Sequence, residues 1–431
     1  MPHLRTNGND QSHAGGLERL ERWARTLRMD LLTPAEQALL AAVDPAPMLA
    51  QVQTWSALNT GTTNLAGLAR QADLLADAFA VLPGTIQLET PAPVTAIDAA
   101  GQDIPIEHGR HLVLSVRPDA PRRFLLTGHM DTVFAPAHPF QQLRQIDADT
   151  LNGPGVADMK GGIAVILAAL QAFEHSPAAA AVGYDVLINA DEETGSLSSA
   201  ALIARLAQGK AAALTYEPSA LPDGTLAGAR AGSGNYALII TGRSAHAGRN
   251  PQDGRNAIVA AAALTLGLKT LERAGLAINP ARIDGGSANN VVPDHAVLRF
   301  NIRPQAAALA DQFEFEINKL IEQVEIQYEV SIHRHGAISR PPKPVDPQAE
   351  RLFALVETCS ALLGRPLSRV ASGGVCDGNN IAACGVPVVD TMGVRGGAIH
   401  SPEEFLIVPS LAERARLSAL VLHRLSLGDP L

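Results

Sequence analysis

The sequence predicts an α/β protein in which a mostly parallel sheet carries helices on both faces and a smaller α+β domain is inserted. Near-continuous apolar segments of strand length alternate with helical patterns, which is typical of buried parallel strands. The middle of the chain changes to a different order of strands and helices. The chain has 431 residues, more than the roughly 250–300 at which single cores stop growing, so we expect two domains.

The chain is expected to be helical before the sheet begins. Apolar residues recur at helical spacing over 17–45, and Thr33-Pro34 restarts the pattern. Asn64 is placed to cap a second helix that ends near Val81. Two strands are then expected, at 85–99 and 111–117.

Four short apolar segments are the expected parallel strands, at 124–127, 186–188, 212–215 and 386–389. Helical patterns separate or flank them, at 159–175, 194–208, 346–363 and 409–426. Ligands of such sheets bind at the carboxyl ends of the strands. Each of these segments is followed by an acidic residue or a histidine, so position alone predicts a ligand site at this edge.

The middle segment predicts a ferredoxin-like unit of order β-α-β-β-α-β. Its strands are expected at 236–242, 277–284, 295–302 and 326–334, and its helices at 254–273 and 306–325. We therefore expect an insertion over 229–341, and the proline-rich run that begins at Pro341 marks the return to the first domain. The first domain then comprises 1–228, of which 1–40 is an N-terminal extension, and 342–431.

Composition excludes several classes of function. The formal net charge is −9 and no dense Lys/Arg block occurs, which argues against nucleic acid and anionic membranes as partners. Three cysteines without a C-x-x-C pair indicate reduced thiols. The first residues carry no apolar signal segment, and no uninterrupted apolar run is long enough to span a bilayer. We therefore expect a cytoplasmic protein.

Residues 152–163 present one carboxylate, Asp158, among four glycines and a proline, directly before a helical pattern. Two interpretations are open. Asp is a favoured helix N-cap, and taken alone the stretch favours that structural role. The alternative is a turn that presents Asp158 to metal ions, and the rest of the chain has to decide between them.

Three consecutive carboxylates, Asp191-Glu192-Glu193, follow one apolar strand. Their mutual repulsion needs compensation, either by solvent in an exposed turn or by a dication. A dication would lower the pKa values of carboxyl groups that would otherwise raise one another's. With a metal, one carboxylate can bind the ion while its neighbour accepts a proton. Taken alone, the stretch supports both interpretations.

Histidines and a further carboxylate end other strands. His129 is followed by Asp131, and a carboxylate at that spacing can hold the second ring nitrogen of a metal-binding histidine. Glu217 and His400 are weak signals individually, because a lone histidine is more often structural. Carboxylates and imidazoles without thiolates together fit a borderline ion such as zinc or cobalt at a hydrolytic site.

These motifs resemble those of the co-catalytic zinc exopeptidases and deacylases. That family includes glutamate carboxypeptidase, acetylornithine deacetylase, succinyl-diaminopimelate desuccinylase and aminoacylase. Seven motifs occur in the family's order, at 128–133, 153–162, 190–196, 216–219, 242–248, 289–293 and 392–401. The resemblance extends over about residues 50–425 and implies a phosphorylase/hydrolase-like catalytic domain with an inserted dimerisation (lid) domain.

The resemblance implies two bound zinc ions, with Co²⁺ or Mn²⁺ as alternatives. His129, Asp158 and Glu217 would hold one ion. Asp158, Glu193 and His400 would hold the other, so that Asp158 bridges the two.

The resemblance also implies roles around the metals. Asp131 would orient His129, and Glu192 would be the general base. The peptide bond between Asp158 and Met159 would be cis.

The inserted domain would pair two subunits, so that the resemblance implies a homodimer. His246 would reach the active site of the partner and stabilise the oxyanion, assisted by Asn290. The structural alternative for His246 is an ordinary surface histidine at a strand end.

The expected activity is cleavage of the amide bond of an N-acyl or N-peptidyl amino acid with a free carboxylate, most like a glutamate carboxypeptidase. The substrate would be a small acyl-amino acid or a short peptide. Arginine binds carboxylates through two parallel hydrogen bonds, and the candidates are Arg230, Arg303, Arg340 and Arg395. An alternative is an acetylornithine deacetylase- or desuccinylase-like deacylase, and a remote one is a catalytically silent metal-binding paralogue.

Overall fold

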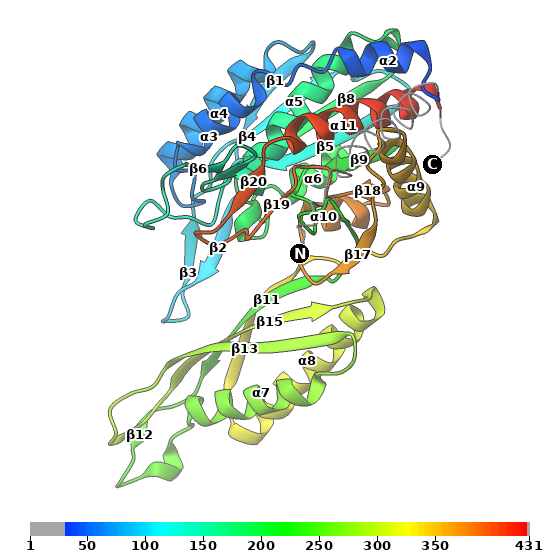
Figure 1. The fold of residues 1–431 in the computed structure, drawn as a ribbon. Coiled ribbons are helices and arrows are strands. Elements are labelled where there is room, and N and C mark those ends of the chain that lie inside the picture. The colour runs from blue at the N-terminus through cyan, green and yellow to red at the C-terminus, as the bar shows by residue number, and fades with distance from the viewer. Residues whose placement is uncertain (1–30, 429–431) are drawn as a thin grey trace, which may run out of the picture.

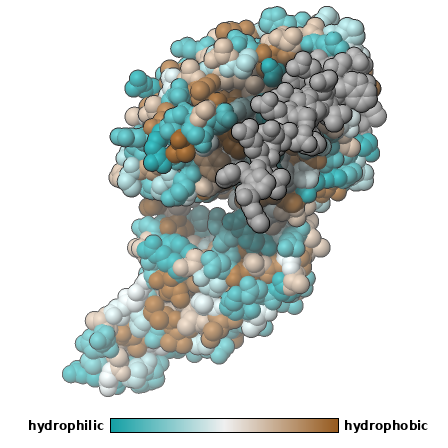
Figure 2. Space-filling model, viewed as in Figure 1, coloured by the Kyte–Doolittle hydropathy of each residue, from teal (hydrophilic) through white to brown (hydrophobic). Residues whose placement is uncertain are grey.

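The computed structural model describes residues 31–428, which form a larger and a smaller body joined at a narrow waist (Figure 1). The larger body contains a six-stranded sheet between helices. The smaller body contains a four-stranded sheet with two helices. Figure 2 shows hydrophilic residues gathered at the waist between the two bodies.

The six-stranded sheet of the larger body has the order β1-β4-β8-β5-β9-β18. Its strands are Thr85–Glu89 (β1), His111–Val116 (β4), Gly183–Asn189 (β8), Arg123–His129 (β5), Ala212–Thr215 (β9) and Val388–Val389 (β18). The last four of these pair in parallel, whereas β1 and β4 are antiparallel to their neighbours.

The expectation of a mostly parallel sheet is met by β8, β5, β9 and β18, but the sheet as a whole is mixed because β4 runs in the opposite direction. Only residues 117–122 separate β4 from β5. A parallel arrangement needs a crossover of roughly a dozen residues or more, so this short link turns β4 antiparallel.

Helices cover both faces of the sheet, as expected, and the alternation of side chains along β5 shows why. Phe124 and Leu126 belong to the core that includes residues of α4 (Leu65–Phe79), α5 (Gly161–Glu174) and α11 (Ser410–Leu427). Leu125 points to the opposite face and packs with α6 (Ala200–Ala207) and α10 (Asp377–Ala383). A strand buried on both faces therefore has no polar side.

The central helix α5 is apolar all round. With the preceding turn it spans Val156–Glu174, and by length and composition alone it could cross a membrane. In the fold 94% of its most apolar window is buried. Its hydropathy is therefore explained by packing between the sheet and the outer helices.

The segments before the sheet only partly follow the expected pattern. Thr33 and Glu36 form a capping box at the start of α2 (Pro34–Ala41), and Asn64 accepts a hydrogen bond from the Gly67 amide at the start of α4. The expected helix over 17–45 is confirmed only in α2, since residues 17–30 lie outside the described part of the chain. A helix that was not expected, α3, spans Met48–Ser56.

The expected strand over 85–99 is two strands, β1 and β2 (Val94–Ile97). β2 forms a hairpin with β3 (Asp103–Ile106), which extends toward the smaller body (Figure 1). The Arg299 guanidinium of the smaller body donates hydrogen bonds to the backbone oxygens of Ile97 and Asp98, at 3.0 and 2.6 Å. The hairpin thereby ties the two bodies together.

The smaller body has the ferredoxin-like order β-α-β-β-α-β, and its sheet order is β13-β15-β11-β16. Its elements are β11 (Ser233–Thr241), α7 (Ala257–Leu271), β13 (Leu276–Gly285), β15 (His295–Pro304), α8 (Ala307–Tyr328) and β16 (Ser331–Arg340). They enclose a separate hydrophobic core between the helices and one face of the sheet.

The strand expected at 326–334 was placed wrongly. Helix α8 continues to Tyr328, Glu329 takes a left-handed conformation at its C-terminus, and the strand begins at Ser331. The shift matters for function because the strand ends at Arg340, at the waist of the molecule.

The remaining elements are short, apart from α9 (Pro347–Leu362). A second four-stranded sheet, order β19-β20-β7-β6, contains Gly396–Gly397, Phe405–Ile407, Thr150–Asn152 and Arg144–Asp147. Two-stranded pairs join β10 (Leu226–Arg230) to β17 (Arg369–Ser372), and β12 (Ala245–His246) to β14 (Val291–Val292). Single turns span Val156–Lys160 (η1), Pro177–Ala181 (η2), Glu192–Thr194 (η3) and Pro251–Asp253 (η4).

Candidate metal centre

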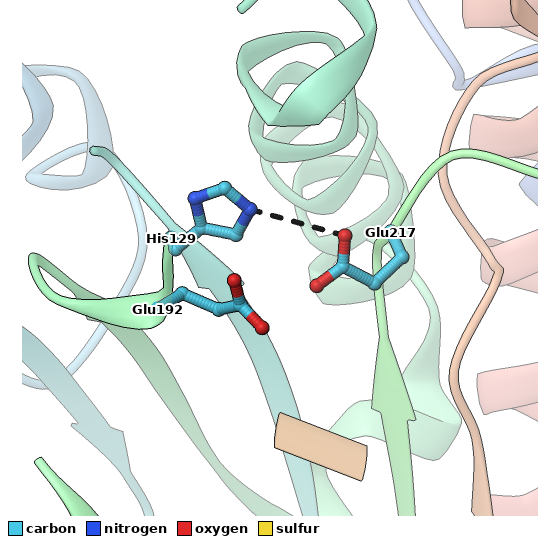
Figure 3. Close-up of side chains that lie close together, drawn as sticks. All are labelled: His129, Glu192 and Glu217. Atoms are coloured by element: carbon cyan, nitrogen blue, oxygen red, sulfur yellow. Dashed lines mark ion pairs between the residues drawn. The ribbon is translucent and has the colours of Figure 1, made fainter. Parts of the chain in front are cut away.

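The carboxyl ends of three adjacent strands bring together residues that are far apart in the sequence. His129 is the last residue of β5, Glu192 follows β8, and Glu217 follows β9. Figure 3 shows these three side chains pointing toward one another. Because β8, β5 and β9 are parallel neighbours, their ends meet at one edge of the sheet.

Asp158 lies between two histidines. Its Oδ1 is 3.0 Å from Nε2 of His129, and its Oδ2 is 3.3 Å from Nε2 of His400. Each carboxylate oxygen therefore faces a different imidazole. This arrangement excludes the N-cap interpretation of the glycine-rich turn, because the Asp158 carboxylate is directed into the cluster and does not cap α5.

Each histidine has a second carboxylate neighbour. Glu217 Oε2 lies 3.8 Å from Nε2 of His129, and Glu193 Oε2 lies 3.1 Å from Nε2 of His400. Two groups of three residues could each hold a metal ion, because within each group the potential ligand atoms lie within 4.8 Å of one another. The groups are His129, Glu192 and Glu217, and His129, Asp158 and Glu193. One side of the cluster is buried, with His129 only 1% exposed, whereas the His400 side chain is 53% exposed.

The electrostatics of the cluster fit a bound cation. Burial and the nearby Asp158 carboxylate raise the pKa of Glu193 to about 8, although the hydrogen bond with His400 opposes this. Hydrogen bonds to Asp158 and Glu193 raise the pKa of His400 to about 11. Burial likewise raises the pKa values of Glu192 and Glu217. Two buried and two half-buried carboxylates beside two imidazoles form a donor set that fits a hydrolytic divalent-metal site.

Asp131 connects His129 to the acidic turn. Its Oδ1 lies 3.4 Å from Nδ1 of His129, and its carboxylate accepts hydrogen bonds of 3.2 Å from the amides of Glu192 and Glu193. The Thr62 hydroxyl donates a further bond of 2.7 Å. One fully buried carboxylate thus holds both a histidine and the turn that carries two further acidic side chains.

The turn that carries Asp158 is held by Glu404, which sequence reasoning missed. The Glu404 carboxylate accepts hydrogen bonds from the backbone amides of Gly155, Ala157 and Asp158, at 3.0–3.2 Å. The peptide bond from Asp158 to Met159 is cis, as the resemblance implied. Glu404 lies four residues after His400, but no local sequence pattern signals its contact with a turn some 250 residues earlier.

The glycines after the turn permit close packing. A Cβ on Gly162 would meet the Tyr216 backbone oxygen at 2.1 Å, so only glycine lets α5 approach the end of β9. Lys160, in the same turn, buries its ammonium group and donates to the backbone oxygens of Trp55 and Leu58 at 3.0 and 3.1 Å. The start of α5 is therefore fixed against both the sheet and α3.

Two clefts open onto the cluster, with volumes of about 450 and 540 Å³. Arg303 and Arg340 of the smaller body line the second, together with Glu192. Arg340 forms an ion pair with the Glu192 carboxylate and donates hydrogen bonds of 2.9 Å to the Glu192 backbone oxygen and the Ser196 hydroxyl. Arg303 donates from Nε to Asn301 at 2.9 Å and is half-buried.

The other two candidate arginines have different surroundings. Arg230 lines the first cleft but is 8% exposed and pairs with the buried Asp390 carboxylate at 2.7 Å. Arg395 donates to the Pro222 backbone oxygen at 3.0 Å and pairs with Glu413 at 3.1 Å. It lines a separate cavity and neither of the two clefts.

His246 and Asn290 lie together, but away from the cluster. Both are exposed; His246 ends β12, Asn290 directly precedes β14, and the Ala247 amide donates to the Asn290 backbone oxygen at 2.9 Å. β12 lies at the end of the smaller body that is remote from the waist (Figure 1). The structure of one chain therefore does not bring these two residues to the other candidate site residues.

Comparison with known proteins agrees with this site. The sequence pattern of Peptidase family M20/M25/M40 matches residues 125–424. Carboxypeptidase G2 of Pseudomonas sp. (strain RS-16) is 26% identical over 398 residues, covering 90% of this chain and 92% of its own. The succinyl-diaminopimelate desuccinylase of Xanthomonas campestris pv. campestris (strain 8004) is 30% identical over 329 residues, covering 70% of this chain and 83% of its own.

Solved structures share the fold. Aminopeptidase PepT from Bacillus cereus ATCC 10987 has a TM-score of 0.68 at 21% identity, covering 89% of this chain and 99% of its own. A dinuclear metal-binding peptidase of Bacillus subtilis has a TM-score of 0.60 at 14% identity, covering 88% of this chain and 98% of its own.

The fold and the cluster of buried carboxylates and imidazoles define a hydrolase of the metal-dependent peptidase or deacylase class. Within that class, the chain belongs to Peptidase family M20/M25/M40, as the match over residues 125–424 shows.

Proposed function

We propose that the protein is a di-zinc amidohydrolase that cleaves the amide bond of an N-acyl or N-peptidyl amino acid with a free carboxylate. The observation that carries this proposal is the position of Asp158, whose two oxygens face two different histidines. Similarity to carboxypeptidase G2 over nine-tenths of both chains favours a carboxypeptidase-like reaction. We expect it to release glutamate or a similar amino acid, as the resemblance to the glutamate carboxypeptidases implies.

We assign His129, Asp158 and Glu217 to one zinc and Asp158, Glu193 and His400 to the other. When bound, zinc polarises a carbonyl group and makes water acidic enough to act as a nucleophile near neutral pH. Co²⁺ and Mn²⁺ suit the same ligands and remain alternatives.

Glu192 is the residue we assign to proton transfer. The ion pair with Arg340 orients its carboxylate through Oε1, and we assign Oε2 to the proton that leaves the attacking water. The same oxygen then returns the proton to the leaving amine. Asp131 supports this step because it accepts a hydrogen bond from the Glu192 amide and so fixes the turn.

Arg303 is the best placed of the four arginines to bind the substrate carboxylate. It lines the cleft next to Glu192 and His400, and its strongest competitor, Arg340, is already paired with Glu192. Arg230 and Arg395 have carboxylate partners of their own. A guanidinium that reaches into the cleft can bind a carboxylate through two parallel hydrogen bonds.

We further propose that residues 229–341 form a dimerisation domain and that the active unit is a homodimer. His246 and Asn290 would act in the site of the partner subunit, where His246 stabilises the oxyanion. Their exposed position at the remote end of the smaller body supports a role toward another chain.

A deacylase is the second candidate, because the desuccinylase of X. campestris is 30% identical over four-fifths of its length. The test is a turnover panel of acyl-glutamates, succinyl-diaminopimelate, acetylornithine and simple acyl-amino acids with the zinc-loaded protein. Preference for acyl-glutamates supports the first candidate, and preference for succinyl-diaminopimelate or acetylornithine supports the second. Two bound metals without hydrolysis of any substrate would favour the catalytically silent paralogue.

A further inference from the structure

A cavity of about 390 Å³ lies behind the loop that carries His400, away from the metal centre. It is formed by the segment that follows α9, by the turn at Asp223 and by the second turn of α11, and α9 and α11 pack against each other (Figure 1). Four arginines line it: Arg365, Arg395, Arg414 and Arg416.

Positive charge exceeds negative charge in this cavity. Its two acidic lining residues are Asp223 and Glu413, so four guanidinium groups face two carboxylates. Glu413 is shared, since it pairs with Arg365 at 2.7 Å and with Arg395 at 3.1 Å. The excess of two positive charges is notable because the whole chain carries a net charge of −9.

Arg414 is buried in the wall of the cavity without a carboxylate partner. Arg414 is 3% exposed, and its Nη2 donates to the Gly224 backbone oxygen at 2.7 Å. Nη1 is also buried and has no hydrogen-bond partner among the described residues. Burial and the adjacent Arg395 lower the pKa of Arg414 to about 10, although the nearby Glu413 carboxylate opposes this shift. A buried guanidinium with an unused donor is costly unless a ligand completes it.

Gly224 lets the turn at Asp223 pack closely against this guanidinium. Its φ of +107° favours glycine, and a Cβ there would lie 2.9 Å from Arg414 Nη2. The backbone of the turn therefore approaches Nη2 of Arg414 more closely than a residue with a Cβ would allow.

We propose that this cavity, lined by Arg365, Arg395, Arg414 and Arg416, is a second small-molecule site that binds a compact, multiply charged oxyanion. The buried guanidinium of Arg414 contributes positive charge to the wall against which the ligand binds. The exposed Arg365 and Arg416 reach it from the rim, where Arg416 has no ion pair with a described residue. Phosphate and dicarboxylate groups share this chemistry, because both offer several acceptor oxygens to forked donors.

The cavity and the catalytic clefts share a wall. Arg395 lines the cavity, and the next two residues, Gly396 and Gly397, line the first cleft. An anion could therefore bind at either place, and the experiment has to separate them. Because it measures binding alone, its outcome is independent of the proposed hydrolytic reaction.

The test is calorimetric titration of the zinc-loaded full-length protein with inorganic phosphate and, separately, with glutarate, in a buffer that contains only monovalent anions. The key variant is the double substitution Arg365→Gln and Arg416→Gln, which changes two exposed side chains and leaves the buried Arg414 in place. The matched control is Arg205→Gln, which removes an exposed arginine that pairs with Glu89 elsewhere on the larger body.

We expect the wild type and Arg205→Gln to bind at least one of the two anions, and the double variant to bind it about tenfold or more weakly. Phosphate alone, or glutarate alone, would identify which anion the cavity prefers. Unchanged binding in the double variant would assign the anion to the metal centre and overturn the proposal. Absence of binding of both anions to the wild type would overturn it as well.

Discussion

At the scale of single residues, the site depends on Asp158. Its two oxygens face two histidines, and Glu404 holds its backbone through three amide hydrogen bonds. The resemblance to known motifs implied the first feature. Only the folded chain reveals the second, because Glu404 and the turn are distant in sequence.

Substituting Asp158 should affect both metals, whereas substituting one histidine should not. We expect Asp158→Ala to lower the zinc content from about two ions per chain to well below one. His129→Ala removes a ligand from one proposed site and should leave about one ion. Zinc is measured by elemental analysis after gel filtration, with circular dichroism as the check on folding. Equal zinc contents in the two variants would contradict the bridging role.

The proposed base can be separated from the metal ligands. Glu192→Gln keeps the size of the side chain and removes its basicity, so we expect both zinc ions to remain and turnover to fall by about 10²–10⁴-fold. Steady-state kinetics together with elemental analysis provide the measurement. Retained activity would rule out Glu192 as the base.

Glu404 should stabilise the fold as well as the site. Glu404→Gln places an amide donor among three backbone donors, and we expect the free energy of unfolding to fall by about 2 kcal/mol. The neighbouring Glu403→Gln is the control, because Glu403 is exposed. Urea unfolding monitored by circular dichroism compares the two. An equal effect of both substitutions would show that the contact with the turn is unimportant.

At the scale of elements, the order of strands creates the site. β8, β5 and β9 are parallel neighbours, so the residues at or just after their carboxyl ends meet although they are about 25 to 90 positions apart. A second element, the β2–β3 hairpin, joins the larger body to the smaller one through Arg299.

The hairpin contact can be tested by hydrogen exchange. Arg299→Ala removes both hydrogen bonds to the hairpin backbone, and we expect faster amide exchange over residues 94–106. Arg282→Ala is the matched control, because Arg282 and Arg299 both form an ion pair with Asp284. The Arg282 side chain is directed toward solvent and is 63% exposed. Mass-spectrometric exchange rates decide the question. Similar exchange rates of residues 94–106 in the two variants would show that Arg299 does not stabilise the hairpin.

At the scale of the whole molecule, the position of His246 separates two possibilities. The structure of one chain leaves it remote from the metal centre, so it can act in catalysis only in the site of a second chain. The alternative is an ordinary surface histidine. A homodimer that exchanges His246 between subunits would require the smaller body to present its remote end to the partner.

Mixing two inactive variants tests this exchange. His246→Ala and Glu192→Gln should each lose most activity as pure proteins. Mixed dimers contain one site that combines an intact Glu192 with an intact His246, so random exchange of subunits should restore about a quarter of the wild-type activity. Kinetic assays of the mixture, with sedimentation to establish the dimer, provide the measurement. A mixture no more active than its components would contradict a role for His246 in the partner's site.

Local chemistry made much of the fold predictable. Asp346 caps α9 and Pro347 opens it, so its expected range of 346–363 agrees with Pro347–Leu362. The short helix α10 was missed because Asp377–Ala383 is too short for a helical pattern to stand out. The strand at 326–334 was misplaced because α8 ends only where Glu329 adopts a left-handed conformation.

The sequence by itself determined the α/β class, the ferredoxin-like order of the insertion and, through its motifs, the side chains proposed as metal ligands, because periodicity, caps and motifs are local properties of the chain. Tertiary structure alone decided the antiparallel direction of β4 in the sheet, the hydrogen bonds of Glu404 to the Asp158 turn and the ion pair of Arg340 with Glu192. These features join segments about 70 to 250 residues apart. They depend on strand order and side-chain packing, which no local pattern encodes.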